Sequence, residues 1–581
     1  MGIVGDRVQR SLARLAEADR PEVWIRLRDP EQLRADAVRL DAEVGRGAEL
    51  PLAGLLVAVK DNVDVRGLPT TAGCPEYAYE PTEDAPAIAR LIAAGALVLG
   101  KTNLDQFATG LVGTRSPYGA VRNAVDPAYV SGGSSSGSAV AVALGIVDIG
   151  IGTDTAGSGR VPAAFNGLVG VKATLGLVPT TGVVPASRSF DAVTVLARDL
   201  VTAADAMRVM IGPDSADPRS RRWPDDVRLS APAHPVVAVP TAPELEPLSP
   251  AYRAAFESAR ATLVEQGVSV REVDVTALIE VARLLYDGAL VAERFAAVGE
   301  FIRANPSGVD PTVRSIVLAA EGMPAHRFVA DLERVERARR DVGELLGDAS
   351  ALMLPTTTEH PTIAQVQADP IAVNRRLGTY TNFVNLLDLA AVAVPAGTAQ
   401  GLPFGVTFVS RAFDDQLGLD VARSFGRGQA WASGGDALII DAGVDLAVFG
   451  AHLSDQPLNS ELLALGGRLI ARILTAPAYR LLALATQPPK PGLVRVGDGG
   501  SAIRGELWRL PVASLGRFLA ALPAPMMLGP VELAGGRWVV GFGCSDEATS
   551  GGVDITSHGG WASYLAATGD SARFCSATLP D

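Results

Sequence analysis

Short apolar runs that alternate with amphipathic segments constrain the fold of this chain more than any other feature. Strands are expected at residues 55–59, 96–99, 148–152, 236–239 and 268–275, and helices at 85–94, 138–146 and 250–266. Before them, apolar and charged positions alternate at helical spacing over 7–47 and predict helices there. Strands that alternate with helices are typical of an α/β layer fold around a mostly parallel or mixed sheet.

The length of the chain requires more than one domain. It has 581 residues, whereas a single hydrophobic core stops growing at ~250–300 residues. The stretch 426–436 is rich in glycine and small side chains, as linkers are. We therefore predict a large domain over 1–435 and a smaller α+β domain over 438–581.

Charge and cysteine content exclude several classes of protein. The formal net charge of −13 argues against general binding to nucleic acid or to an anionic membrane surface. The three cysteines, Cys74, Cys544 and Cys575, are far apart and form neither a disulfide framework nor a zinc-binding spacing. The start of the chain has no signal-peptide pattern, and no apolar run approaches the ~18–20 residues of a membrane span. We expect a cytoplasmic protein.

A glycine- and serine-rich stretch, Ser131–Ser138, is the most informative local pattern, together with the Gly-Thr-Asp-Thr-Ala-Gly-Ser segment that begins at Gly152. A flexible linker is one interpretation, but this stretch opens directly into the apolar helix that begins near Ala139. A phosphate-binding loop is another, because free N–H groups at a helix start bind anions. Neither Gly-x-x-x-x-Gly-Lys-Ser/Thr nor Gly-x-Gly-x-x-Gly after a strand is present, however. The third interpretation is a serine hydrolase.

Gly133–Gly137 formally matches the Gly-x-Ser-x-Gly motif of α/β-hydrolases. That fold needs an acid and then a histidine downstream, and none of the five histidines lies at a strand end after such an acid. A serine nucleophile without histidine needs another base, and Lys60 at the end of the strand over 55–59 can supply one. Burial would lower its pKa from ~10.4 toward neutrality. The alternative is a solvated surface lysine.

At this point the residues resemble the amidase signature family. The resemblance spans about residues 50–430 in the family's order and spacing, and is carried by Leu55–Asn62, Ser131–Ser138, Gly152–Ser158, Val169–Thr174 and Val394–Gly397. It implies an α/β fold with a central mixed sheet flanked by helices. It also implies that Ser158 is the nucleophile, Ser134 a bridging serine on a cis peptide, and Lys60 the base.

The loop before Ser158 predicts an oxyanion site. Thr155, Ala156 and Gly157 are small, so that their N–H groups can converge on a developing negative charge. Ser134 would relay the proton between Ser158 and Lys60. No metal or organic cofactor is needed for this chemistry, and we expect none.

The substrate must be inferred from residues outside the family motifs. Tyr286 and Arg294 are eight residues apart on a helix predicted over 284–295, and so near one face. An arginine held there could bind a small carboxylate with two hydrogen bonds. An ordinary amphipathic helix with a solvated arginine remains the alternative from spacing alone.

Resemblance favours the first interpretation. The segment is similar to the allophanate hydrolases, as are Trp24–Arg26, Thr109–Tyr118 and the trailing domain with Val448–Ser454. The resemblance implies hydrolysis of a small anionic amide, allophanate, in urea or s-triazine nitrogen catabolism, with Tyr286 and Arg294 holding the substrate carboxylate. Separately, we expect the chain to form a homodimer. The rival predictions are a broad-specificity amidase and a partner-dependent amidotransferase component.

The second domain gives a weaker signal. A predicted strand runs into a tight loop at Gly450, which vaguely resembles the carboxylate-binding loop of γ-glutamylcyclotransferase-like folds. His452 would lie where a small anion binds and could exchange a proton near neutral pH. A purely structural histidine is the alternative.

Overall fold

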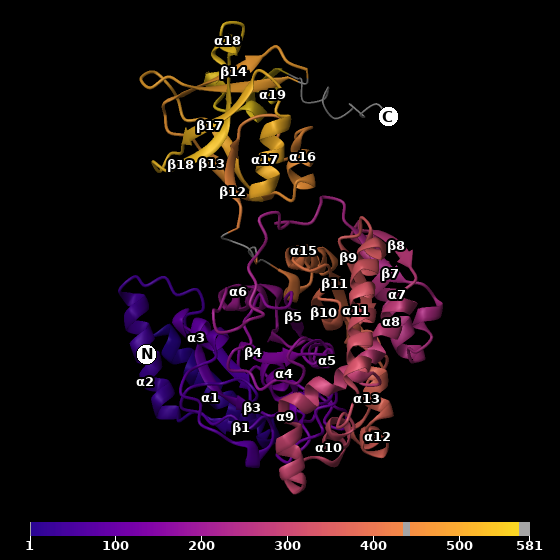
Figure 1. Ribbon diagram of the computed structural model, residues 1–581. Helices are drawn as coiled ribbons and strands as arrows, with labels where there is room; N and C mark the ends of the chain where they lie inside the picture. Colours follow the sequence, from indigo (N-terminus) through magenta and orange to yellow (C-terminus); the bar gives the residue numbers. More distant parts are fainter. Residues whose placement is uncertain (1, 434–437, 439–441, 488, 569–581) are drawn as a thin grey trace. The chain divides into compact units, whose positions relative to one another are not determined.

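The structure is a computed structural model that describes residues 2–433, 438, 442–487 and 489–568. These residues form two compact units, which Figure 1 shows. The first consists of Met1–Arg222 and His234–Leu438, and the second of Trp223–Ala233 and Ile439–Asp581. The predicted boundary between 435 and 438 falls on residues 434–437, which lie outside the described residues.

The first unit contains an 11-stranded mixed sheet with the order β1-β3-β2-β4-β6-β5-β10-β11-β9-β7-β8. This confirms the predicted central mixed sheet. Its strands are β1 Trp24–Leu27, β2 Leu56–Lys60, β3 Leu97–Thr102, β4 Ile149–Asp154, β5 Val169–Lys172, β6 Ala192–Ala197, β7 Val236–Pro240, β8 Ser269–Val273, β9 Ala351–Pro355, β10 Ala390–Ala399 and β11 Leu402–Ser410.

Helices flank this sheet (Figure 1), as expected for an α/β fold. They are α1 Ile3–Ala18, α2 Pro30–Gly45, α3 Pro86–Ala93, α4 Ser136–Ala143, α5 Arg160–Phe165, α6 Leu200–Met210, α7 Pro250–Glu265, α8 Thr276–Ala282, α9 Ala292–Ala304, α10 Pro311–Leu318, α11 Ala325–Leu346, α12 Ile363–Ala368, α13 Ala372–Leu377, α14 Asn382–Leu386 and α15 Asp415–Phe425. Three of them have a common start: α2, α7 and α10 have proline in the first turn after a capping Asp29, Ser249 or Asp310.

Strand β2 lies between two parallel neighbours, and this places the lysine at its end. Val57 pairs with Val98 of β3 and with Ile149 of β4. All five residues of β2 are buried, as the continuous apolar run predicts for a strand covered on both faces. Because parallel strands end at the same edge of a sheet, Lys60 emerges beside the ends of β3 and β4.

The second unit is β-rich. It has a five-stranded sheet with the order β13-β16-β12-β18-β17 and a three-stranded sheet with the order β15-β14-β19. Its strands are β12 Val444–Val448, β13 Arg468–Leu474, β14 Tyr479–Leu484, β15 Lys490–Arg495, β16 Arg504–Leu510, β17 Met526–Glu532, β18 Trp538–Cys544 and β19 Val553–Asp554, and its helices are α16 Asn459–Ala464, α17 Val512–Ala521, α18 Asp546–Thr549 and α19 Trp561–Thr568. The likeness to γ-glutamylcyclotransferase folds stays a prediction.

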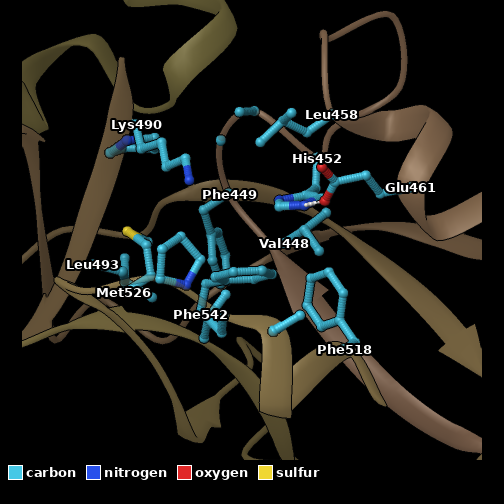
Figure 2. Close-up of a pocket in the computed structure, with 16 residues that line it drawn as sticks. Val448, Phe449, His452, Leu458, Glu461, Lys490, Leu493, Phe518, Met526 and Phe542 are labelled. Atoms are coloured by element: carbon cyan, nitrogen blue, oxygen red, sulfur yellow. Dashed lines mark hydrogen bonds and ion pairs between the residues drawn. The ribbon is translucent and has the colours of Figure 1, made fainter. Parts of the chain in front are cut away.

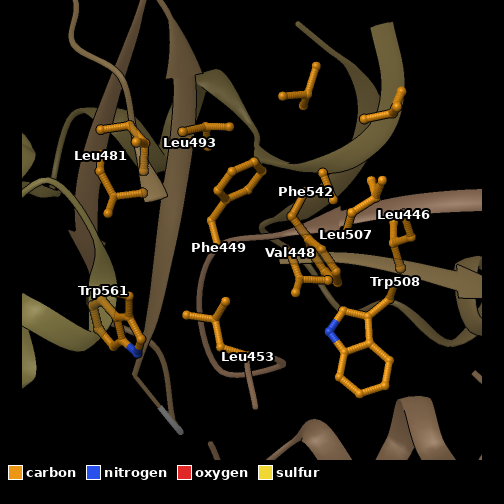
Figure 3. Close-up of a cluster of buried hydrophobic side chains, with 14 of the residues drawn as sticks. Leu446, Val448, Phe449, Leu453, Leu481, Leu493, Leu507, Trp508, Phe542 and Trp561 are labelled. Atoms are coloured by element: carbon orange, nitrogen blue, oxygen red, sulfur yellow. The ribbon is translucent and has the colours of Figure 1, made fainter. Parts of the chain in front are cut away.

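The second unit has its own hydrophobic core. Figure 3 shows side chains from β12 and β16, among them Leu446, Val448 and Trp508, packed with Phe542 of β18. Burial of this kind contributes ~25 cal/mol for each Å² of apolar surface removed from water.

A short segment far from the rest of the second unit in sequence also belongs to it. Within Trp223–Ala233, the N–H of Leu229 donates to Gly466 O (2.9 Å) and Ser230 Oγ donates to Gly467 O (2.5 Å). Leu229 is 1% exposed. No pattern in the sequence marked this segment as part of the second unit.

Candidate active site

Lys60 is fully buried and its ammonium group contacts three oxygen atoms. Its Nζ donates to Ser134 Oγ (2.8 Å), Thr153 Oγ1 (2.7 Å) and Thr153 O (3.3 Å). Burial lowers the pKa of Lys60 to about 7, against the opposing effect of the Asp105, Asp154 and Asp191 carboxylates. A lysine in this state is available as a base near neutral pH.

The serine-rich loop brings Ser134 to Lys60. The Gly133–Ser134 peptide bond is cis, as the family resemblance implies. Ser158 lies next to this loop, because its carbonyl accepts a hydrogen bond from the Ser135 N–H (3.2 Å). The Ser158 hydroxyl donates to Gly110 O (3.4 Å). Among the described residues no hydrogen bond joins the hydroxyls of Ser134 and Ser158.

The loop between β4 and α5 is built around one buried ion pair. The Asp154 carboxylate accepts hydrogen bonds from the Arg160 Nε (2.9 Å) and Nη2 (2.8 Å), and both side chains are 0% exposed. Burial alone would raise the pKa of Asp154, but Arg160 and nearby N–H groups outweigh it and lower that pKa. Asp154, the last residue of β4, therefore binds Arg160, the first residue of α5, and so holds the two ends of the loop that carries Ser158 together.

One predicted oxyanion donor needs correction. The Gly157 N–H donates to Asp154 (2.8 Å) and so does not face open space in this structure. Gly157 has a φ of 113°, and a Cβ there would clash with the Thr381 side chain, so that only glycine fits. The Thr155 side chain is held by Asp191, and no described residue accepts from the Thr155 or Ala156 N–H. These two remain candidate donors.

Tyr286 and Arg294 come together, but not on one helix. The predicted helix over 284–295 is wrong: a 3-10 turn at Arg283–Leu285 ends before Tyr286, a second one spans Ala289–Val291, and α9 begins at Ala292. The Arg294 Nη2 donates to the Tyr286 hydroxyl (3.0 Å), and its guanidinium lies 4.9 Å from the ring centroid. An extended Gly288 (φ −98°, ψ −170°) interrupts the helical turns, and the contact that helical spacing suggested forms across this break.

Arg294 is a buried cation whose hydrogen-bond partners among the described residues are neutral. It is 1% exposed, and its Nη1 donates to Thr109 Oγ1 (3.1 Å). Its Nε is buried and has no hydrogen-bond partner among the described residues. Burying a cation is costly unless it is compensated, and the buried Asp191 carboxylate interacts with Arg294 electrostatically. The free Nε makes Arg294 a candidate for binding an anion.

Sequence reasoning missed Thr153, Thr109 and Gly110. Thr153 could have been found, because β2 and β4 pair in parallel with Val59 opposite Ile151, and so the residues after this pair meet at the same edge. Nothing in the spacing of Thr109 and Gly110 links them to Arg294 and Ser158. That link depends on a loop fold that no local pattern specifies.

The second unit contains a separate cavity of about 370 Å³. His452 and Lys490 project toward it in Figure 2, and the His452 Nε2 lies 3.1 Å from Glu461 Oε2. The His452 ring stacks on Phe542 at 5.0 Å. Burial lowers the pKa of His452, although Glu461 opposes the shift. The predicted His452 therefore lies in a cavity lined with one lysine, one glutamate and otherwise largely apolar side chains.

Comparison with known proteins gives the class. A family model described as Amidase matches residues 6–419, and one described as Allophanate hydrolase C-terminal domain matches residues 444–566. The chain belongs to the amidase family. Within it, the chain is similar over almost its whole length to a solved structure of Kluyveromyces lactis allophanate hydrolase, with 40% identity, 97% of each chain covered and a TM-score of 0.87.

Two curated relatives place this similarity in a wider family. The urea amidolyase of Saccharomyces cerevisiae is 41% identical over 93% of this chain, which spans only 31% of that protein. A glutamyl-tRNA(Gln) amidotransferase chain of Symbiobacterium thermophilum is 35% identical over 67% of this chain and 86% of that protein. No helix in the described part of the chain is long and apolar enough to cross a membrane.

Proposed function

We propose that this chain is an allophanate hydrolase that releases ammonia from urea-1-carboxylate. The observation that carries the proposal is Arg294, a buried guanidinium with an unpartnered Nε and no acidic hydrogen-bond partner among the described residues. A substrate carboxylate would accept hydrogen bonds from this Nε and from a second N–H of the guanidinium. The similarity to K. lactis allophanate hydrolase across both units supports the same substrate.

The proposed reaction uses Ser158, Ser134 and Lys60. Lys60 takes a proton from Ser134, which takes the proton of Ser158 as that oxygen attacks the urea-type carbonyl. Substrate would displace the Ser158 hydroxyl from Gly110 O toward Ser134, since such bonds tighten only in the complex. Thr155 and Ala156 N–H groups stabilise the oxyanion. Ammonia leaves with the relayed proton, and water then cleaves the acyl-enzyme to N-carboxycarbamate.

The pathway follows from the chemistry of the substrate. Allophanate must come from a reaction that carboxylates urea, or from hydrolysis of an s-triazine-derived compound. The curated urea amidolyases are about three times as long as the stretch that this chain matches. We propose that this chain carries out the hydrolytic step in such a pathway.

The deciding experiment compares ammonia release from allophanate, acetamide and benzamide by the full chain. The proposal requires a clear preference for allophanate. Comparable kcat/KM values for all three would indicate a broad-specificity amidase instead. Labelling with a serine-directed fluorophosphonate tests the amidotransferase rival. An independent hydrolase should form a covalent adduct that the Ser158→Ala variant does not form. Absence of an adduct with both the purified wild-type chain and the variant would contradict an independent hydrolase.

The cavity of the second unit supports a second activity. N-carboxycarbamate is a small dianion, and Lys490 and His452 line a space of suitable size. We propose that this unit accelerates its breakdown to ammonia and carbon dioxide, with His452 transferring a proton. NMR during turnover tests this: His452→Ala should accumulate N-carboxycarbamate while ammonia release by the first unit continues. Equal accumulation by wild type and variant would leave an assembly role for this unit.

We also propose that the protein is a homodimer in the cytoplasm. Strand β13 lies at an edge of the five-stranded sheet and exposes Leu469, Ile470 and Leu474 at 40%, 43% and 46%. An exposed apolar edge strand favours pairing with another chain. Sedimentation of wild type and Ile470→Lys would test it, with the dimer lost in the variant. A wild-type monomer would contradict this assembly.

A further inference from the structure

The loop between β3 and α4 contains a stretch that contacts three residues of the candidate site. The Asp105 N–H donates to Ser134 O (3.3 Å), Gly110 O accepts from Ser158 Oγ (3.4 Å), and Thr109 Oγ1 accepts from Arg294 Nη1 (3.1 Å). We call residues Asp105–Arg115 the bridging loop. It reaches the bridging serine, the nucleophile and the anion-binding arginine from one short stretch of chain.

The bridging loop is held rigidly by its own buried charges. The Asp105 carboxylate accepts from the N–H groups of Val112 (3.1 Å), Gly113 (2.9 Å) and Arg115 (3.0 Å). The Arg115 guanidinium in turn donates to Thr109 O (2.9 Å). Asp105, Thr109 and Arg115 are at most 2% exposed. The backbone of Thr109 is therefore fixed from both directions.

The backbone conformation just before Thr109 is unusual. Phe107 and Ala108 have φ values of 51° and 53°, in the left-handed region that side chains rarely adopt. Such positions persist only where the surrounding structure specifies them. Here the bend directs the Thr109 hydroxyl to Arg294, while Thr109 Oγ1 donates its own proton to Phe107 O (3.2 Å). The lone pairs of the hydroxyl are thus left for the arginine.

Arg294 depends on few contacts for its orientation. Within the described part of the chain, its guanidinium donates to Tyr286, from the same stretch of sequence, and to Thr109, from the bridging loop. The bond to Thr109 ties the guanidinium to the loop that touches Ser134 and Ser158. An arginine side chain has many rotamers and must be fixed in one of them to bind in a defined place. A carboxylate bound ~1 Å out of place would misplace the reacting carbonyl.

We propose that Thr109 is a positioning and specificity-determining residue, which sets the distance between the anion-binding Arg294 and the nucleophile Ser158. The inference rests on the proposed function, since it assumes that Arg294 binds the substrate carboxylate. Thr109 touches no reacting atom. It selects small substrates whose carboxylate and scissile carbonyl match the spacing that the bridging loop defines.

The test is a double-mutant cycle on binding and turnover. Thr109→Val keeps the shape of the side chain and removes the hydroxyl, and should lower kcat/KM for allophanate about 10- to 100-fold, as for loss of a charge-assisted hydrogen bond. Thr109→Ser should recover to within about threefold of wild type. In an Arg294→Ala background, Thr109→Val should cost less than about twofold, because coupled residues are not additive.

Binding separates this inference from the proposed reaction. Malonamate, in which a methylene replaces the bridging N–H of allophanate, is titrated into the Ser158→Ala variant, where turnover is blocked. Thr109→Val should raise its dissociation constant about tenfold or more, and only when Arg294 is present. Thr407→Val, at a buried threonine bonded to Thr356 (2.9 Å), controls for the general effect of such a change.

Two outcomes overturn the inference: equal losses from Thr109→Val with and without Arg294, or no binding of malonamate to Ser158→Ala. A chain that binds malonamate with the expected coupling but releases no ammonia from allophanate would overturn the proposed reaction alone.

Discussion

Lys60 shows how one buried residue can define the pH behaviour of a site. It is 0% exposed, and its hydrogen bonds go to Ser134 and to Thr153, both neutral partners. Desolvation disfavours the charged ammonium, so the neutral base is populated at a pH where a free lysine is protonated. The same property makes two predictions at this scale.

The first concerns rate. Since the neutral form of Lys60 is required, kcat/KM for allophanate should rise about tenfold per pH unit below about 7 and level off above it. Lys60→Ala should lower activity ~100-fold or more. A pH–rate profile with a plateau extending below about pH 6, or a variant with about a tenth of wild-type activity, would contradict the role of Lys60 as base.

The second concerns stability. The pKa of Lys60 falls from 10.5 to about 7 on folding, so that between these values the unfolded chain binds more protons and stability rises with pH. Below about pH 7 the burial cost of the charge is fully present. Lys60→Met should therefore raise the free energy of unfolding most at about pH 6 and least above about pH 10. Urea unfolding at both pH values measures this, and an equal change at both would contradict it.

Arg294 makes a prediction about selectivity. Arg294→Ala should raise KM for allophanate, because loss of a charge-assisted contact costs ~1.5–3 kcal/mol or more. Hydrolysis of acetamide, which has no carboxylate, should change much less. Steady-state kinetics on both substrates decide the matter, and equal losses would show that Arg294 has only a structural role.

At the scale of elements, the loop between β4 and α5 depends on a salt bridge at the sheet edge. Asp154 and Arg160 form this pair, and the Arg160 Nη2 also donates to Asn385 Oδ1 (2.9 Å) at α14. The nucleophile loop is thereby fixed to a helix that is distant in sequence. Its shape is set by long-range contacts rather than by its glycines alone.

Removal of the Asp154 carboxylate should destabilise the loop between β4 and α5. Asp154→Ala leaves Arg160 buried without its counter-charge, which costs ~3–5 kcal/mol. Urea unfolding should show that loss together with abolished ammonia release. Glu300→Ala, which breaks an exposed pair with Arg303 on α9, is the matched control and should change stability by less than ~1 kcal/mol. Similar effects of the two variants would contradict this role of Asp154.

At the scale of the molecule, the two units are not consecutive in sequence. Trp223–Ala233 belongs to the second unit, where Val227 and Leu229 are 4% and 1% exposed. A chain cut at residue 433 would carry these apolar side chains without the rest of the unit to which they belong. Exposed apolar surface of this kind favours aggregation.

Two truncated chains test this arrangement. Residues 1–433 should aggregate in size-exclusion chromatography. The same chain with 223–233 replaced by a short glycine–serine linker should stay monodisperse and release ammonia from allophanate. Identical behaviour of the two would show that the segment does not need the second unit.

The sequence by itself determined the features that depend on the local order of residues, namely the positions of buried strands and the catalytic motifs. Apolar runs of strand length predicted β2, β4 and β7 to within about two residues, because burial on both faces leaves a continuous apolar pattern. The motifs around Lys60, Ser134 and Ser158 carried the family resemblance because the chemistry needs those residue types in that order. Strand β1, at the sheet edge after a short turn, was absorbed into a predicted helical segment.

Only the tertiary structure decided which groups meet. Helical spacing predicted that Tyr286 and Arg294 lie close together on one continuous helix. They are in contact, but two short turns separated by a break replace that helix. The contact of Thr109 with Arg294 spans 185 residues of sequence. Hydrogen bonds and buried charges are satisfied by whichever group the fold supplies, and their partners are therefore not encoded in any local pattern.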